Sequence, residues 1–450
     1  MLTLGSLFDG SGGFPLAGAV NGFEPVWASE VEPYPIAVTR SRFPQMLHLG
    51  NVCEVNGAMI KPVDVITFGS PCQSLSVAGK REGLRHTDLG DDETTRSGLF
   101  MEAVRIITEM RKETNGEFPK FCCWENVPGA LSSSGGADFL AVLENLAKIA
   151  DPEVSIPKPD KWCANGEIIG DGFSLAWRII DARHFGVTVR DGDTDDVLVR
   201  GTPQRRRRIY LVADFRGTRA GKILFECAGV QGNSEPCAET RQGTAADVKG
   251  SVGADDCIGF DGYNGELTGD VQSTLGVNCD RSTGRNGAIL NCMHDQQAVL
   301  VLYRQGGFAD YVENEAGTVR AAGGDYGGDY GGGSETLVRK NYLVRRLTPT
   351  ECARLQGFPD TWGHPDIKTE LTDEEYTFWQ TVRDTHAEIG GKPQKTYTRE
   401  QMLKWYNKLH TDSAEYKMWG NGIALPCAHF VLNRIAKELT HDNQNPTADA

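Results

Sequence analysis

No apolar run in the 450-residue sequence is long enough to span a bilayer, although 39% of the residues are hydrophobic and 24% are charged. A membrane-spanning helix needs about 20 consecutive apolar residues. Residues 1–9 also lack the basic flank and long apolar core of a signal peptide, and their pattern predicts a buried first strand. We therefore expect a cytoplasmic protein without a membrane partner.

Cysteine motifs with metal-ligand spacing are also missing. The 12 cysteines form no Cys-x-x-Cys motif and no Cys/His cluster of that kind. In a long chain without a secretory signal, such thiols are expected to remain reduced. The sequence therefore predicts neither a disulfide scaffold nor a metal site.

Positive charge is scarce as well. The chain has 46 Lys and Arg against 61 Asp and Glu, which gives a formal net charge of −15. A surface that binds nucleic acid must neutralise phosphates with Lys and Arg, so this balance argues weakly against such a partner. Net charge averages over all faces, however, and one basic face remains compatible with it.

The length of the chain favours two domains. In residues 1–215, short apolar runs alternate with helical stretches, which predicts an α/β domain with a parallel sheet and crossover helices. Ligands of such sheets bind outside the carboxyl ends of the strands. The expected strands are Leu4–Phe8, Val26–Ser29, Val63–Gly69, Phe121–Glu125, Leu175–Ile180 and Ile209–Ala213, and the expected helices are Leu99–Lys112 and Ala137–Ile149.

The composition changes after this domain. Residues 216–342 are rich in Gly, Asn, Asp and Thr with short β-prone runs, which predicts a separate, irregular β-rich domain. Residues 343–417 are expected to end that domain and to continue as a helical connection. Residues 418–440 are expected to form a helix that returns to the first domain, and residues 441–450 to be disordered.

A glycine-rich turn, Phe8-Asp9-Gly10-Ser11-Gly12-Gly13-Phe14, follows the first expected strand. Its glycines would let backbone N–H groups approach a ligand closely. The next strand ends in Glu30, a position from which a carboxylate can accept hydrogen bonds from ribose hydroxyls. Together they indicate a cofactor that contains adenosine, with NAD, FAD and S-adenosylmethionine all open. A tight turn beside a solvated glutamate is the simpler alternative.

Another expected strand leads into the turn Ser70-Pro71-Cys72-Gln73. Proline stiffens the turn, and a thiolate placed there can act as a nucleophile. Considered alone, Cys72 fits a packed cysteine better, because free cysteine is among the most buried residue types. The neighbouring motifs favour the nucleophile.

The strand at residues 121–125 ends in Glu125-Asn126, at the same sheet edge. A protonated Glu125 can donate to N3 of cytosine while its other oxygen accepts from the exocyclic amine, and this makes C6 electrophilic. Cys72 would then attack C6. A glutamate that only caps the turn is the alternative.

An arginine run, residues 205–208, follows Gln204 and leads into an apolar strand. Strand alternation places Arg206 and Arg208 on one face. The run fits a solvated edge or a phosphate contact, but its position directly before a core strand favours a role in the site.

With these motifs in this order, the sequence resembles the cytosine-C5 DNA methyltransferase family of bacteria and phages. Two further segments, residues 346–359 and 420–424, strengthen the resemblance, which spans residues 2–215 and 340–440. It implies a Rossmann-like domain that uses S-adenosylmethionine, with a mostly parallel sheet. It also implies that the middle domain is the family's variable target-recognition region.

The resemblance implies a role for each motif. Cys72 would attack C6 of a cytosine flipped out of duplex DNA, with Glu125 at N3 and with Asn126, Arg206 and Arg208 in support, before the methyl group reaches C5. The implied cofactor-binding residues are Phe8, Asp9, Gly10, Ser11, Gly12, Gly13, Glu30, Val31, Asn51, Val52, Ser70, Pro71, Asn421 and Gly422. The implied DNA-contacting residues are Gln73, Ser76, Arg96, Gln204, Thr318 and Val319.

The sequence departs from the family pattern at several positions. Asp9 stands where small residues are common, Val31 replaces an aromatic residue, and Asn51 stands at a usual aspartate. The loop after Cys72 is long and acidic, for which the family offers no explanation. Residues 188–200 form an acidic insertion, which we expect to be an exposed hairpin.

The resemblance further implies a monomer that acts on duplex DNA, with a cognate restriction endonuclease that acts separately. A related RNA cytosine methyltransferase would use the same residues, although a recognition region of this length favours DNA. A binding protein without turnover would lack a catalytic residue, yet Cys72, Glu125, Arg206 and Asn421 are all present. A dehydrogenase is disfavoured, because the turn glycines do not follow Gly-x-Gly-x-x-Gly spacing. The target sequence cannot be predicted.

Overall fold

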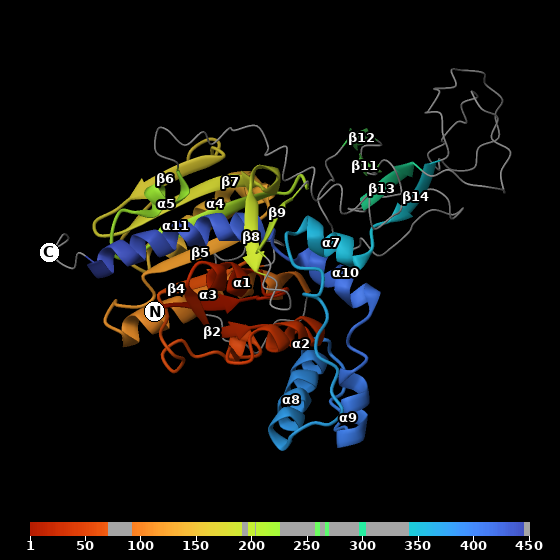
Figure 1. Ribbon diagram of the computed structural model, residues 1–450. Helices are drawn as coiled ribbons and strands as arrows, with labels where there is room; N and C mark the ends of the chain where they lie inside the picture. The colour runs from red at the N-terminus through yellow and green to blue at the C-terminus, as the bar shows by residue number, and fades with distance from the viewer. Residues whose placement is uncertain are drawn as a thin grey trace, which may run out of the picture.

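An eight-stranded mixed sheet forms the centre of the computed structural model (Figure 1). The structure describes residues 1–70, 92–190, 197–202, 204–225, 257–261, 266–269, 297–302 and 342–444. In spatial order the strands are β3 (Leu47–His48), β2 (Phe23–Ser29), β1 (Leu2–Leu7), β4 (Val65–Phe68), β5 (Phe121–Asn126), β10 (Arg207–Asp214), β7 (Ser174–Asp181) and β6 (Asn165–Ile169).

The first five strands in this order pair in parallel. The strand β10 runs antiparallel to both β5 and β7, and β6 runs antiparallel to β7. The predicted α/β fold is confirmed, with a sheet that is antiparallel on one side. Each predicted strand is present with its ends moved by a few residues.

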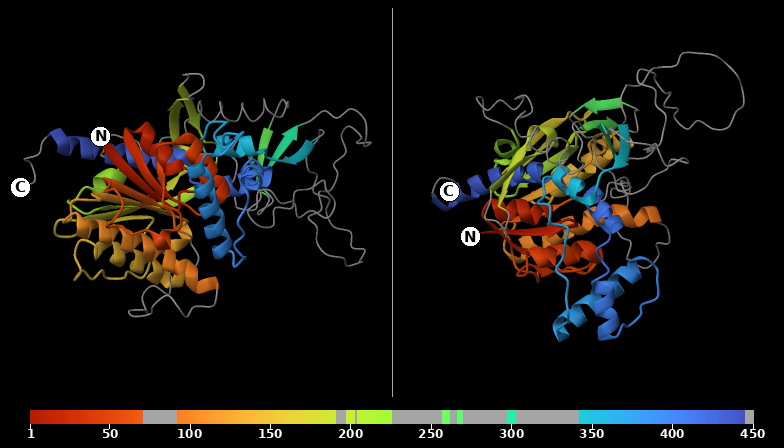
Figure 2. Two further views of the ribbon diagram at one scale, coloured as in Figure 1. Left: turned by 90° about the horizontal axis from the view of Figure 1, so that it is seen from below. Right: turned by 45° about the vertical axis from the view of Figure 1, so that its right-hand side comes forward.

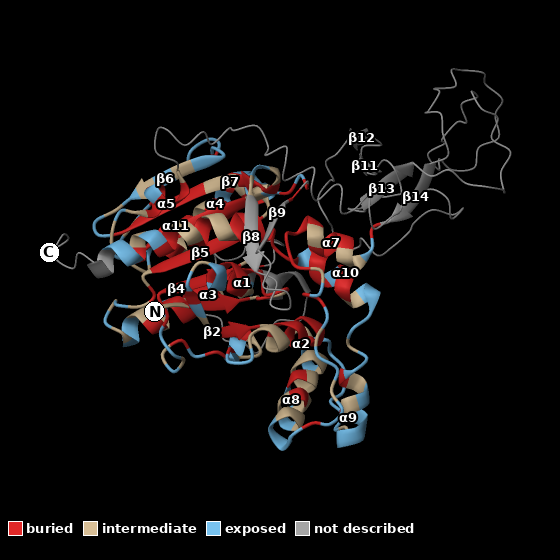
Figure 3. Ribbon diagram, in the orientation of Figure 1, coloured by how far each residue is buried: buried red, intermediate tan, exposed pale blue. Residues whose placement is uncertain are grey.

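Helices cover both faces of the sheet and enclose two apolar cores (Figure 2). One core includes α1 (Gly13–Val20), α5 (Ala220–Leu224) and α11 (Leu425–Gln444), and the other includes α3 (Asp92–Glu113) and α4 (Ala137–Ala147). Neighbours along a strand point to opposite faces. In β5, Phe121 and Cys123 therefore join the first core, whereas Cys122 and Trp124 join the second. Figure 3 shows the buried residues concentrated in these layers.

Short 3-10 helices follow several strands. They are η1 (Val52–Glu54), η3 (Pro128–Leu131), η4 (Ser133–Gly136) and η5 (Ala182–His184). The strands β8 (Gly186–Arg190) and β9 (Val197–Gly201) then form an antiparallel pair, which confirms the hairpin predicted for residues 188–200.

A second sheet is antiparallel and has the order β12-β11-β13-β14. Its strands are β11 (Cys257–Asp261), β12 (Glu266–Gly269), β13 (Gln297–Leu302) and β14 (Tyr342–Arg346). These strands agree with the β-rich composition of the middle region. The helix α5 nevertheless contributes Ala220, Ile223 and Leu224 to the first core, so the start of that region packs with the main sheet. The boundary predicted between the first and the middle domain remains a prediction.

Helices dominate the rest of the chain: α7 (Pro349–Leu355), α8 (Asp373–Ile389), α9 (Arg399–Tyr406), α10 (Asp412–Asn421) and α11. Capping boxes start α7, α8 and α9, with Thr348, Thr372 and Thr398 as the N-caps. The helices α8 and α9 pack on α2 (Pro33–Arg42) and project from the main body (Figure 1).

The predicted C-terminal boundaries need correction. Residues 418–421 belong to α10, and the last helix begins at Leu425. That helix continues to Gln444, so residues 441–444 of the predicted disordered tail are helical, because α11 packs against the core as far as Leu439 and its last turns simply continue. No helix within the described ranges combines the length and apolar character that crossing a membrane requires.

Candidate cofactor and base site

The candidate site lies where the strand order reverses. The chain runs outward from β1 to β2 and β3, then returns to place β4 on the other side of β1. Ligands of open α/β sheets bind at the carboxyl ends of the strands at such a point. The predicted glycine loop, Glu30, Ser70 and Glu125 all follow or end strands at this edge.

The glycine loop has an unusual backbone. Phe8, Gly10 and Gly12 all have positive φ, at 56°, 54° and 75°. A Cβ on Gly12 would lie 2.7 Å from a methyl carbon of Thr39, and one on Gly13 would lie 2.5 Å from Ile423. Packing therefore requires Gly12 and Gly13, whereas space around Gly10 is open. The close approach of the three backbone N–H groups to a ligand remains a prediction.

Glu30 fastens this loop to the end of β2. Its Oε2 accepts a hydrogen bond from the backbone N of Gly10 at 2.8 Å, and its Oε1 accepts from those of Val31 and Glu32 at 2.8 and 2.9 Å. Burial raises the pKa of Glu30, and these hydrogen bonds oppose the rise. Carboxylate oxygens have further lone pairs, so contact with ribose hydroxyls remains a prediction.

Two buried oxygen atoms in the loop have no hydrogen-bond partner within the described part of the chain: Oδ2 of Asp9 and Oγ of Ser11. The other Asp9 oxygen accepts from the Ser6 hydroxyl at 2.7 Å. Burial raises the pKa of Asp9 to about 8. Buried polar atoms are normally satisfied by protein, water or ligand, so these two fit a polar ligand at the loop.

Asn51 and Val52 lie after β3. The side-chain oxygen of Asn51 accepts from the backbone N of Cys53 at 3.1 Å and caps η1, while the Val52 side chain is buried in the second core. The Asn51 side chain thus caps η1 and the Val52 side chain packs in the core, and the contact of both residues with the cofactor remains a prediction.

The end of β4 is held by the end of β5. The indole N–H of Trp124 donates to Ser70 Oγ at 3.1 Å, and the Asn126 amide donates to the Ser70 carbonyl at 3.2 Å. Ser70 is therefore fixed directly before Pro71 and Cys72. Asn126 and Trp124 both hold Ser70 in place, and no local pattern in the sequence indicates the contact of Trp124.

Several predicted residues lie outside the description. Residues 71–91 and 303–341 are not described, and α3 is described without the side chains of its first turns. The residues concerned are Pro71, Cys72, Gln73, Ser76, Arg96, Thr318 and Val319.

Glu125 is buried at the end of β5, with 9% of its surface exposed. Its Oε1 lies 3.2 Å from Nε of Arg208. Its Oε2 would lie 3.3 Å from a Cβ on Gly69, so that glycine leaves room for the carboxyl group. Burial raises the pKa of Glu125, and the two arginines Arg208 and Arg206 oppose the rise.

Arg206 has a different set of contacts. It is 2% exposed, and its Nη2 donates to the carbonyl of Gly422 at 2.5 Å and to that of Gly420 at 3.4 Å. Burial lowers its pKa to about 9. A Cβ on Gly422 would lie 2.9 Å from Ser11 Oγ. Arg206 thus fastens the segment around Asn421 against the glycine loop.

Two buried polar groups nearby have no hydrogen-bond partner in the described ranges: the side-chain amide of Gln204 and the hydroxyl of Tyr210. Gln204 is fully buried. Tyr210 lies opposite Glu125 in the β5–β10 pair. The sequence did not single out Tyr210, although its two-residue spacing from Arg208 along one strand is a usable signal.

Several known methyltransferases are similar in sequence to this chain. The chain is 28% identical to the DNA N-6-adenine-methyltransferase of Escherichia phage P1, over 98% of this chain and 62% of that protein. It is 24% identical to the type II methyltransferase M.Bsp6I of Bacillus sp. (strain RFL6), over 82% of this chain and 90% of the relative. It is 29% identical to the type II methyltransferase M.MspI of Moraxella sp, over 46% of this chain and 37% of the relative.

The chain thus spans less than two thirds of the phage P1 and M.MspI proteins. A solved structure, a putative DNA modification methyltransferase encoded within a prophage of E. coli, aligns over 98% of this chain and 100% of its own, with a TM-score of 0.46 and 16% identity. The model of the C-5 cytosine-specific DNA methylase family matches residues 2–151 and 198–375, more than half of the sequence. The chain therefore belongs to this family, whose methyl donor is S-adenosylmethionine.

Proposed function

We propose that this protein transfers a methyl group from S-adenosylmethionine to C5 of a cytosine in duplex DNA. The observation that carries the proposal is the buried carboxyl group of Glu125, held on one oxygen by Arg208 at the edge where Ser70 leads to Cys72. We expect the protein to act in the cytoplasm as a monomer.

The proposed reaction uses Cys72 as nucleophile and Glu125 as acid. The Cys72 thiolate forms a bond to C6 of a flipped cytosine while Glu125 delivers a proton to N3. Because Arg208 occupies Oε1, the proton belongs on Oε2 beside Gly69. When bound, the cofactor supplies an electrophilic methyl group for C5. The N3 proton returns to Glu125, the C5 proton passes to solvent, and the thiolate leaves C6, which restores the aromatic ring.

The residues for the cofactor are those of the glycine loop and its neighbours. The unpaired oxygens of Asp9 and Ser11 would bind its polar atoms, and Glu30 its ribose. Gly422, fastened by Arg206, would close the far side. The donor set carries both charge and hydrogen-bonding capacity, which fits a ligand with an amino acid part and a ribose.

We assign target recognition to residues 216–342, including Thr318 and Val319. Gln204 would meet the DNA with its unpaired amide, and Gln73, Ser76 and Arg96 from the loop after Cys72 would contact it as well. The type II names of several relatives are the reason to propose a cognate restriction endonuclease that acts separately.

A second candidate is methylation of adenine at N6, which the name of the phage P1 relative favours. The exocyclic amine of adenine attacks a methyl donor directly, so that reaction needs no thiol at a ring carbon. Replacement of Cys72 therefore separates the two activities.

The test uses duplex DNA from a methylation-free host and labelled S-adenosylmethionine, with base-resolution mapping of the product and tRNA as a parallel substrate. We expect 5-methylcytosine at one sequence in DNA. Transfer to adenine only, or to tRNA only, would overturn the proposal. Cys72→Ser should still bind S-adenosylhomocysteine but should lose both methyl transfer and the covalent complex with 5-fluorocytosine DNA.

A further inference from the structure

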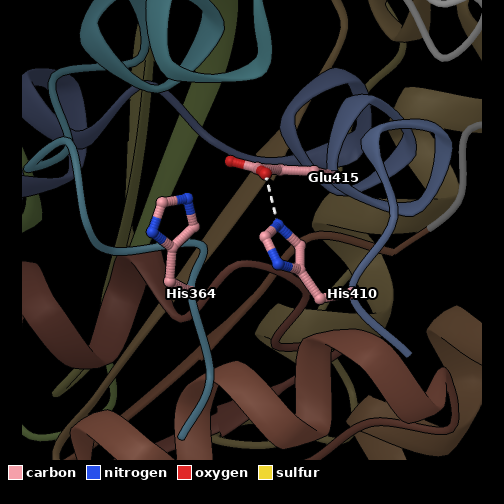
Figure 4. A group of neighbouring side chains, drawn as sticks. All are labelled: His364, His410 and Glu415. Carbon is pink, nitrogen blue, oxygen red and sulfur yellow. Dashed lines mark hydrogen bonds and ion pairs between the residues drawn. The ribbon is translucent and has the colours of Figure 1, made fainter. Parts of the chain in front are cut away.

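Three side chains with metal-binding atoms meet beside α2, where the chain leads into α8 and leaves α9. His364 lies between α7 and α8, His410 lies directly before α10, and Glu415 lies in the first turn of α10. Their ligand atoms all lie within 4.8 Å of one another. Figure 4 shows both imidazole rings facing the space beside the Glu415 carboxylate.

From this geometry we propose a binding site for a divalent transition metal, with Zn²⁺ as the best match. Two histidines and a glutamate form one of the ligand sets that zinc uses in proteins, with a fourth position left for water. Bonds of about 2.0 to 2.2 Å in a tetrahedron place ligand atoms roughly 3.4 Å apart. Both histidines are exposed, so small rotations of their side chains suffice to reach that spacing.

Two neighbouring side chains orient the carboxylate of Glu415 for a cation. Glu415 is 2% exposed, and its Oε1 accepts from the indole N–H of Trp419 at 3.1 Å. Such outer hydrogen bonds orient a metal ligand. The other oxygen, Oε2, lies 2.9 Å from Nε2 of His410. A buried carboxylate needs a positive partner, and a divalent cation bound by the three side chains supplies one.

The two histidines are positioned by α2. The His410 ring stacks on Tyr34, with 5.8 Å between ring centroids and an interplanar angle of 4°. The Tyr34 hydroxyl donates to the carbonyl of Gly363 at 2.5 Å, and Arg42 donates to that of His364 at 3.2 Å. A Cβ on Gly363 would lie 2.6 Å from Glu415 Oε1, so the residue before His364 must be small. The cluster is therefore organised before any metal binds.

A metal here would join the two ends of the helical appendage, which we define as residues 365–409. His364 precedes this segment and His410 follows it. A bond between the ends of a long segment restricts the unfolded chain, and the binding free energy adds to the stability of the folded state. The bound metal would therefore stabilise the folded appendage and would take no part in methyl transfer.

The test measures metal binding to the full-length protein after treatment with EDTA. We expect one high-affinity Zn²⁺ per chain by calorimetry, and Co²⁺ absorption bands typical of four-coordination. His364→Ala should abolish both signals, and so should His410→Ala. The exposed His184 lies elsewhere, on η5, so His184→Ala should keep both signals.

Thermal unfolding gives a second measurement. Zn²⁺ should raise the unfolding temperature of the wild-type protein and of His184→Ala, but not that of His364→Ala. His410→Ala also loses the partner of a buried carboxylate and is expected to be less stable without metal, so His364→Ala is the decisive variant. Zn²⁺ binding of unchanged stoichiometry and affinity in His364→Ala would overturn the proposal.

Discussion

Glu125 tests the acid step of the proposed reaction, because burial raises the pKa of its carboxyl group at the edge of the sheet. Glu125→Gln keeps the size of the side chain and can still donate an N–H to N3, but it cannot transfer a proton. We expect single-turnover methyl transfer to fall by about 10²- to 10⁴-fold, the usual contribution of a positioned acid. Binding of S-adenosylhomocysteine should be unchanged. A rate close to that of the wild type would remove Glu125 from the mechanism.

Asp9 is expected to make the free energy of unfolding depend on pH. Its pKa is raised from 3.8 to about 8 in the folded state, so the folded chain holds a proton that the unfolded chain has lost. The contribution of Asp9 to stability is therefore full below about pH 4 and is lost as the pH rises towards 8, by at most roughly 1.4 kcal/mol per pH unit.

Asp9→Asn should remove this dependence, because an amide is neutral at every pH and still accepts the hydrogen bond from Ser6. Denaturant unfolding of both proteins without cofactor, in steps between pH 5 and pH 8, measures the difference. If the free energy of unfolding changed with pH equally in the two proteins, Asp9 would be ionised in the folded state.

At the scale of elements, Arg206 connects the start of β10 to the end of α10. Arg206→Lys keeps a positive charge but loses the planar group that reaches Gly420 and Gly422. We expect a loss of stability of about 1.5–3 kcal/mol, the usual value for hydrogen bonds to a charged group. Cofactor affinity should also fall, because Gly422 lies against Ser11.

The exposed neighbour Arg207 provides a matched control for this substitution. Arg207→Lys should change neither the free energy of unfolding nor the affinity for S-adenosylhomocysteine. If both variants behaved alike, the contact of Arg206 with the C-terminal segment would have no energetic role.

At this scale the sequence predicts the features that depend on residues close together in the chain. Apolar runs predict six of the eight strands of the main sheet but neither β3 nor β6, and the acidic insertion at residues 188–200 is confirmed as a hairpin. Contacts between distant segments were not accessible in this way. Gly13 is required by Ile423, and Arg206 reaches Gly422, more than 200 residues further along the chain. The contact between His364 and His410 is likewise one between distant segments, and no local spacing in the sequence predicts it.

At the scale of the whole molecule, the helical appendage has an apolar core of its own. Trp379, Val382, Met402 and Tyr406 form this cluster with Ile36 and other residues, apart from the two cores on the faces of the main sheet. Trp379 is 1% exposed and is its largest side chain. The appendage is therefore expected to unfold locally, at a lower free energy than the sheet.

Trp379→Ala tests this division of the molecule. Removal of a buried tryptophan costs about 3–5 kcal/mol, and the loss should fall on the appendage alone. Hydrogen exchange should show faster exchange for the amides of α8 and α9, while those of β1, β4 and β5 keep their protection. Methyl transfer should remain within a few fold of the wild type, because no proposed catalytic residue lies in the appendage. A uniform loss of protection across the sheet would instead mean that appendage and sheet unfold as one cooperative unit.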